Sequence, residues 1–258
     1  MNEPTRGYDK WESYLPVYED IMRSVPYGSN YLELGVQNLG WIGTLDPHRR
    51  FVRAVGCDID PRVEMCWENT RFTDIIIGHS CSSETVKTIK SLNLRFQLIV
   101  DDASHMQQDV LANFLAYFDL VADQGNFVIE DTHTDFVPMF SEPNEFEISI
   151  YEFFGSLASI GTMKELNRGL ERESKAYTAM CKVLSRSECD RIIDSVQRIE
   201  FVNSCIHITK GKSSLGRRVI GGEYFPVVSR HILESFSIKS LTNLIPPVDS
   251  EGEAADPN

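Results

Sequence analysis

The chain has 258 residues, 42% of them hydrophobic, and a formal net charge of −13. This length and composition are those of a globular protein with one large domain, and the acidic balance excludes a general nucleic-acid binder, which needs a basic surface. No apolar run approaches the roughly 20 residues that span a bilayer, and the N-terminal sequence lacks a signal-peptide pattern. We therefore expect a soluble cytoplasmic protein that binds neither membrane nor nucleic acid.

The cysteines show no paired CxxC spacing and no disulfide framework, so reduced, mostly buried thiols are expected. The sequence "GHSC" at residues 78–81 offers His79 and Cys81 as zinc ligands. It lacks a second ligand pair at a recognisable spacing, so the sequence alone does not predict a zinc site.

The first half of the chain alternates helical and strand patterns. Residues 14–24 fit a short amphipathic helix. Apolar runs at 30–36, 51–60 and 73–80 predict three strands, and the segment that begins at Ser82 or Ser83 predicts a helix with a serine N-cap. Strands of nearly continuous apolar character that alternate with helices indicate a parallel sheet covered on both faces.

Two further strands end in acidic residues. "LIVDDASH" at 98–105 ends in Asp101 and Asp102, and "FVIEDTH" at 127–133 ends in Glu130 and Asp131. Each pair is followed by a histidine, His105 and His133 respectively. The helical spacing of 107–122 places a helix between these strands, which we expect the sequence "DQG" at 123–125 to close.

The C-terminal part is predicted to complete the sheet. Residues 199–211 read as two strands joined by a tight turn at Asn203 and Ser204. The predicted fold is therefore α/β, a Rossmann-like doubly wound sheet, mostly parallel, with a C-terminal antiparallel hairpin. We predict a single domain over 1–245, with an N-terminal helical cap at about 7–28, a helical insertion at about 141–198, and a disordered acidic tail at 246–258.

The first strand-to-helix turn indicates the type of cofactor. "ELGVQNLGWIG" at 33–43 lacks the GxGxxG spacing that a pyrophosphate requires. It supplies Gly35, preceded by Glu33, and Asp58 follows at about the distance expected for an acid that accepts from ribose hydroxyls. A nucleoside cofactor without a pyrophosphate, such as S-adenosylmethionine, fits this turn better than NAD.

Five segments in order resemble the class I methyltransferases of the macrocin O-methyltransferase type, which act on sugar hydroxyls of glycosylated natural products and are related to cephalosporin-modifying proteins. The segments are "GYDKWESYLPVYEDIM", "YLELGVQNLG", "VGCDIDP", "IVDDASH" and "VIEDTHT", followed by the similar "EISIYEFFGSLA" and "IHITKG". The similarity extends over about residues 7–222, and the two acidic motifs are its specific part. Ala103 stands at the family's usual glycine, and Leu39, Gly40 and Trp41 stand where GGS is usual.

The resemblance implies a Mg²⁺-dependent O-methyl transfer from S-adenosylmethionine to a small-molecule acceptor, a sugar or glycoside. It places His105 as the general base and the metal at Asp102, Glu130 and Asp131, with the choice between the last two left open. The predicted cofactor-binding residues are Glu33, Gly35, Asp58, His79 and Asp101. The helical segment after about residue 144 is predicted to form a lid or an oligomer contact, and we expect a homo-oligomer.

The predicted metal site also follows from elementary electrostatics. Neighbouring strands would bring Asp102, Glu130 and Asp131 to one edge of the sheet, where three carboxylates repel unless a cation joins them. Carboxylate oxygens suit Mg²⁺. An imidazole such as that of His105 accepts a proton near neutral pH.

Two other functions remain open from the sequence. One is a cofactor-binding partner protein on the same fold without catalysis, which the altered loop at Trp41 favours. The other is a nicotinamide oxidoreductase, which the missing GxGxxG disfavours.

Overall fold

The computed structural model describes residues 10–37, 39, 41–64, 71–141, 146–166, 172 and 174–212, except for the side chains of 162–166. These residues all belong to one compact unit, Met1–Ser214. The second unit, Leu215–Asn258, lies outside the described residues, and so does the acidic tail predicted at 246–258. The predicted single domain over 1–245 therefore stays a prediction.

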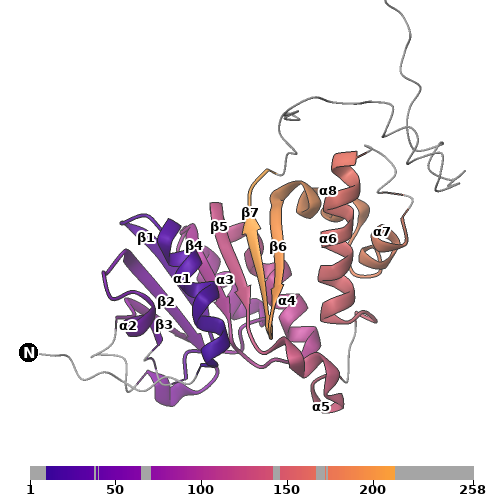
Figure 1. The fold of residues 1–258 in the computed structure, drawn as a ribbon. Helices are drawn as coiled ribbons and strands as arrows, with labels where there is room; N and C mark the ends of the chain where they lie inside the picture. The colour runs from indigo at the N-terminus through magenta and orange to yellow at the C-terminus, as the bar shows by residue number, and fades with distance from the viewer. Residues whose placement is uncertain are drawn as a thin grey trace, which may run out of the picture. The chain divides into compact units, whose positions relative to one another are not determined.

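A seven-stranded sheet in the order β3-β2-β1-β4-β5-β7-β6 forms the centre of the fold (Figure 1). Strands β1 to β5 pair in parallel, while β7 pairs antiparallel with both β5 and β6. This confirms the predicted fold class, a mostly parallel α/β sheet with a C-terminal hairpin. The strands are β1 (Ser29–Leu34), β2 (Phe51–Asp58), β3 (Asp74–Ile77), β4 (Phe96–Asp101), β5 (Val121–Ile129), β6 (Val196–Val202) and β7 (Cys205–Lys210).

Helices cover both faces of the sheet, as continuous apolar strands require. One apolar core contains buried residues of η1 (Glu12–Tyr14), α1 (Leu15–Ser24) and α2 (Trp41–Leu45). A second core lies on the other face and contains residues of α3 (Ser83–Ser91), α4 (Gln107–Tyr117), α6 (Ile150–Leu166), α7 (Lys175–Met180) and α8 (Arg186–Ser195). The remaining elements are the short helices η2 (Pro61–Val63), η4 (Phe118–Leu120), η5 (Thr132–Phe136) and α5 (Pro138–Ser141).

The strand order reverses between β1 and β4. From β1 the chain moves outward to β2 and β3, and then returns to place β4 on the other side of β1. Leu34 of β1 pairs with Asp101 of β4, which in turn pairs with Ile129 of β5. The three strands therefore end at the same level, at the topological switch point where open α/β sheets bind ligands.

Several local predictions are confirmed. Helix α3 begins after Ser82, whose hydroxyl accepts a hydrogen bond of 3.2 Å from the backbone N–H of Thr85. The hairpin turn lies at Asn203, whose φ of 54° is the left-handed conformation that asparagine tolerates in tight turns.

The prediction that residues 123–125 close the fourth helix is wrong. Helix α4 ends at Tyr117, the turn η4 follows, and β5 begins at Val121. Val121 pairs with Phe96 of β4, and the register then shifts before Leu98 pairs with Asn126. Gln124 has a φ of 59°, so the turn-like sequence marks an irregularity inside the strand and not a helix end.

Gly35, directly after β1, is required by its conformation and by its neighbours. Its φ is +84°, and a Cβ at this position would lie 2.1 Å from the carbonyl oxygen of Asp102. The backbone N–H of Asp102 also donates to the carbonyl of Leu34 at 2.9 Å. The loop that follows β1, which we call the first loop, and the acidic tip of β4 are therefore in backbone contact. No side chain fits between them at Gly35.

We predict that Gly35→Ala lowers the free energy of unfolding by at least about 1 kcal/mol, because a left-handed φ and a backbone clash both penalise a Cβ. Urea denaturation measures this loss. The matched control is Gly155→Ala in α6, where an added Cβ meets nothing within 4 Å. Alanine there should raise stability by about 0.5 to 1 kcal/mol. Equal stability of Gly35→Ala and the unmodified protein would contradict the close approach.

Candidate functional site

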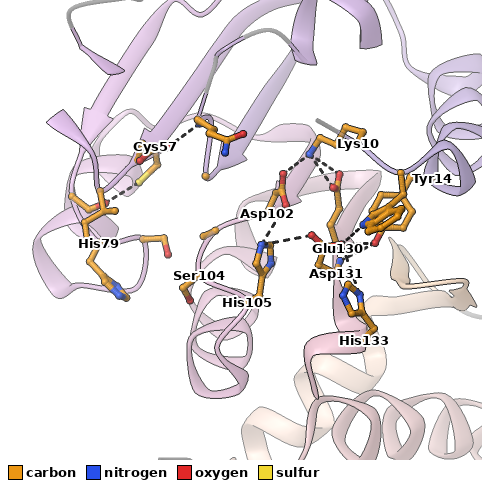
Figure 2. Close-up of a pocket in the computed structure, with 18 residues that line it drawn as sticks. Lys10, Tyr14, Cys57, His79, Asp102, Ser104, His105, Glu130, Asp131 and His133 are labelled. Carbon is orange, nitrogen blue, oxygen red and sulfur yellow. Dashed lines mark hydrogen bonds and ion pairs between the residues drawn. The ribbon is translucent and has the colours of Figure 1, made fainter. Parts of the chain in front are cut away.

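A cavity of about 490 Å³ opens at the carboxyl ends of the central strands (Figure 2). This volume lies within the usual range for small-molecule sites. Its wall combines the first loop, the acidic tips of β4 and β5, and the N-terminal segment. The lining residues are Lys10, Trp11, Tyr14, Gly35, Gln37, Cys57, Asp58, Ile59, Gly78, His79, Ser80, Asp102, Ala103, Ser104, His105, Glu130, Asp131 and His133.

Lys10 lies among the acidic groups of the cavity wall. Its Nζ is 2.5 Å from Asp102 Oδ2, 2.9 Å from Glu130 Oε2 and 3.9 Å from Glu33 Oε1. The Lys10 side chain is only 4% exposed. A buried ammonium of this kind supplies the counter-charge that three carboxylates need.

Burial and charge act in opposite directions on these groups. Burial alone would lower the pKa of Lys10, but Glu130, Glu33 and Asp102 raise it above its ordinary value, so the ammonium stays protonated. Burial raises the pKa of Glu33 to about 8, against the opposing effect of Lys10. Burial also raises the pKa of Glu130. The positive charge of Lys10 therefore offsets only part of the effect of burial on these carboxylates. A second cation at the cluster would favour their ionised forms further.

Asp131 is held by two aromatic side chains of the N-terminal segment. Its Oδ1 accepts a hydrogen bond of 2.6 Å from the hydroxyl of Tyr14 and one of 3.1 Å from Trp11 Nε1. Its φ of 52° is a left-handed conformation that is uncommon outside glycine. The adjacent Glu130 accepts from the hydroxyl of Tyr18. Residues 10–18 thus bind the acidic tips of both β4 and β5, and we call them the donor segment.

The remaining oxygen of each aspartate faces His105. Its Nε2 lies 3.8 Å from Asp102 Oδ1 and 3.7 Å from Asp131 Oδ2 (Figure 2). One ligand atom from each of these three residues can be chosen so that all lie within 4.8 Å of one another. His105 itself has a φ of 58°. The geometry suits a hard divalent cation held by two carboxylates, with other positions left for water or substrate oxygens.

The two acidic residues at the tip of β5 have different partners. The Glu130 carboxylate is occupied by Lys10 and Tyr18, whereas Asp131 turns one oxygen toward Asp102 and His105. Both line the cavity. The geometry therefore favours Asp131 over Glu130 as the residue that could bind a metal together with Asp102.

Asp58 holds the first loop. Its Oδ2 accepts from the backbone N–H groups of Val36 and Gln37 at 3.0 and 2.9 Å, and its Oδ1 accepts from that of Asp60 at 2.8 Å. Asp58 also lines the cavity, together with Gly35 and His79. Three of the five predicted cofactor-binding residues are therefore in the wall of one cavity.

The other two, Glu33 and Asp101, are absent from the cavity wall of the described residues. Glu33 lies behind it, beside Lys10. Asp101 is 2% exposed and accepts from Asn113 Nδ2 at 3.1 and 3.2 Å. Burial raises the pKa of Asp101 to about 7. Their contacts are those of residues that support the wall.

Sequence reasoning did not assign roles to the donor segment. Lys10, Trp11, Tyr14 and Tyr18 lie in the first segment of the family resemblance, but no pattern within it indicates what they contact. A usable signal was the spacing of Lys10, Tyr14 and Tyr18, which is four residues each time, although Lys10 lies before the first helix, η1, and only Tyr14 and Tyr18 are in helical structure.

Two of the departures from the family pattern, Ala103 and Trp41, do not obstruct the cavity. Ala103 is not among the described residues with positive φ, so the position does not require glycine. Trp41 is 4% exposed and packs edge-on against Tyr18, with ring centroids 5.0 Å apart. Lys10 Nζ lies 5.6 Å from the Trp41 ring. Trp41 supports the donor segment from beneath and does not enter the cavity.

None of the helices in the described residues is both long and apolar enough to cross a membrane. No family model and no curated protein matches the chain. Solved structures do match. MycE methyltransferase from the mycinamycin biosynthetic pathway, in complex with Mg and SAH, superposes with a TM-score of 0.62 at 20% identity, over 88% of this chain and 56% of that chain. The fold is that of a class I methyltransferase.

A second MycE structure, in complex with Mg, SAH and mycinamycin VI, gives a TM-score of 0.61 at 20% identity, over 88% of this chain. The chain spans just over half the length of these neighbours, 56% in both cases. At this identity the likeness shows the fold, and the predicted class I methyltransferase architecture is confirmed.

We predict that Lys10→Gln destabilises the metal-free protein by about 3 to 5 kcal/mol, because it leaves buried carboxylates without their cation. Urea denaturation in EDTA measures the loss. Mg²⁺ binds only the folded cluster and therefore stabilises the folded protein. It should stabilise the variant more than the unmodified protein, because the carboxylates of the variant have lost the Lys10 cation.

The matched control is Lys90→Gln on the exposed face of α3, which should change stability by less than about 0.5 kcal/mol. An unchanged stability of Lys10→Gln in EDTA would show that Lys10 does not compensate the carboxylates.

Proposed function

We propose that this protein is an S-adenosylmethionine-dependent, Mg²⁺-assisted O-methyltransferase that acts on a hydroxyl of a sugar or glycosylated small molecule. The observation that carries the proposal is the convergence of Asp102 Oδ1 and Asp131 Oδ2 on His105 Nε2 inside the cavity. The fold match to methyltransferase structures that contain Mg, SAH and, in one case, mycinamycin VI supports it.

The donor set fits Mg²⁺. The structure offers carboxylate oxygens from Asp102 and Asp131 at an open cavity, and Mg²⁺ binds through one or two carboxylates while it keeps other positions for water and substrate. Asp102 and Asp131 would hold the ion, and Glu130 would remain the partner of Lys10. A divalent cation here would lower the pKa of an acceptor hydroxyl, which is otherwise too weak an acid to react near neutral pH.

His105 has the position of a general base. Its Nε2 faces both aspartates, so an acceptor hydroxyl placed between them lies within reach of the imidazole. His105 would take the hydroxyl proton as the oxygen attacks the methyl group, a role that contributes typically 10²- to 10⁴-fold to a rate. The close backbone packing of Gly35 against Asp102 would fix the position of the Asp102 carboxylate, and a fixed position of the acceptor oxygen would supply a further part of the acceleration.

The cavity also fits a nucleoside cofactor without a pyrophosphate. The loop that Asp58 holds, the backbone at Gly35 and the segment around His79 form one end of the wall. His105 and the acidic pair form the other end, so that a sulfonium methyl group can reach the acceptor. Because Trp41 is packed in the core, it gives no reason for a loss of cofactor binding.

We predict that S-adenosylhomocysteine binds the protein with micromolar affinity in isothermal titration, and that Asp102→Asn weakens Mg²⁺ binding by at least about tenfold, as loss of a ligand should. Asp20→Asn on the exposed face of α1 is the control and should leave both affinities unchanged. Absence of S-adenosylhomocysteine binding would contradict the proposal. Unchanged Mg²⁺ binding by Asp102→Asn would contradict only the metal assignment.

We predict that His105→Ala lowers methyl transfer to a glycoside acceptor by about 10²- to 10⁴-fold and leaves the dissociation constant of S-adenosylhomocysteine within about threefold. Transfer of labelled methyl to a glycoside panel and calorimetry measure the two quantities. The exposed His48, which lies outside the cavity wall, provides the control variant His48→Ala. Retained transfer by His105→Ala would exclude His105 as the base.

A further inference from the structure

A second cluster of ligating side chains lies beside His79, which lines the cavity away from Lys10. Figure 2 shows His79 on the opposite side of the cavity from Lys10 and Tyr14. His79 and Cys81 follow β3, and Asp109 lies in the first turn of α4. His79 and Cys81 lie close together in the sequence, whereas Asp109 lies 28 positions after Cys81 and is brought to them by the fold.

The cluster is compact. Cys81 Sγ lies 3.2 Å from His79 Nδ1 and 3.4 Å from Asp109 Oδ1. The other ring nitrogen of His79, Nε2, lies 3.4 Å from the other oxygen of Asp109, Oδ2, so this contact holds the two side chains together but does not belong to the same set of ligand atoms. One ligand atom from each residue can be chosen so that all lie within 4.8 Å of one another.

The two distances from Cys81 Sγ are close to those between neighbouring ligands of a tetrahedral site. Zinc bonds of about 2.3 Å to sulfur and about 2.0 Å to nitrogen or oxygen place neighbouring ligand atoms roughly 3.3 to 3.5 Å apart. The Sγ to Nδ1 and Sγ to Oδ1 distances, 3.2 and 3.4 Å, are close to that range. A thiolate, an imidazole and a carboxylate leave a fourth position open, the arrangement of three-ligand zinc sites.

The two clusters offer different chemistry. Asp102 and Asp131 present hard oxygen atoms, whereas Cys81 adds a soft sulfur atom that Mg²⁺ does not favour. The His79 side chain is 42% exposed and that of Asp109 is 11% exposed, so a cation can reach the cluster from solvent.

We propose that His79, Cys81 and Asp109 form a binding site for a thiophilic divalent cation of the Zn²⁺ type, separate from the Asp102–Asp131 pair. The proposal does not depend on the proposed methyl transfer. In the metal-free protein the Cys81 thiol donates to Asp109. Binding of the cation replaces this hydrogen bond by two bonds to the metal, and the thiol proton passes to solvent.

The site is connected to the loop that carries His105. Asp109 Oδ2 accepts a hydrogen bond of 2.7 Å from the hydroxyl of Ser104, which lies between Asp102 and His105 in the sequence. The Ser104 hydroxyl also accepts from the backbone N–H of Met106 at 3.2 Å. A cation that fixes Asp109 would therefore fix the loop that carries His105, in the way that groups behind metal ligands orient their neighbours.

The test uses the full chain, stripped of metal with EDTA and desalted. Co²⁺ replaces Zn²⁺ as the probe, because a thiolate–cobalt bond gives a charge-transfer absorption band and tetrahedral coordination gives strong visible bands. The expected result is one equivalent of Co²⁺ with both features, displaced by Zn²⁺. Cys81→Ser should remove the charge-transfer band, and Asp109→Asn should weaken Zn²⁺ binding by at least about tenfold.

Two control variants locate the ion. Cys181→Ser removes another free thiol, which faces Cys189 at 3.7 Å, and Asp102→Asn removes one carboxylate of the Asp102–Asp131 pair. Both should keep the charge-transfer band. A band that survives in Cys81→Ser or disappears in Cys181→Ser would overturn the proposal, as would the absence of any band. Circular dichroism of each variant shows whether a lost band reflects lost folding, and His79→Gln then provides an independent ligand variant.

Discussion

The site depends on one buried ammonium group. Lys10 Nζ contacts Asp102 and Glu130 and lies 3.9 Å from Glu33, at a sheet edge where these carboxylates would otherwise repel one another. The parallel register brings the acids together, because β1, β4 and β5 end at the same level. The Lys10 cation favours their ionised forms against the effect of burial, and it leaves one oxygen of Asp102 directed toward His105.

The donor segment divides the acidic oxygens into two sets. Trp11 and Tyr14 bind one oxygen of Asp131, just as Lys10 binds one oxygen of Asp102. The two free oxygens then face the same point. Hydrogen bonds that hold a carboxylate in place fix the direction in which it can bind a cation. The geometry of the cavity is therefore determined as much by the donor segment as by the tips of β4 and β5.

The sequence allowed the architecture and the acidic tips to be predicted, because both depend on local patterns. Apolar runs of strand length located β1 to β5, and two acidic pairs with trailing histidines marked the switch point. The role of Lys10 could not be derived in this way, since its partners lie 92 and 120 residues away. Asp109 lies next to Cys81 only in the folded chain. Gln124 lies in a sequence typical of turns, but it belongs to β5 because this segment pairs with β4.

The same long separations bear on how the site is assembled. A contact between residues 92 or 120 positions apart closes a large loop, and its entropy is lost before the contact stabilises anything. Lys10 can meet Asp102 and Glu130 only when β4 and β5 are already side by side in register. The cavity wall at Lys10 is therefore complete only in a chain whose β4 and β5 are already paired, and a chain with unpaired strands would leave the acidic tips without their cation.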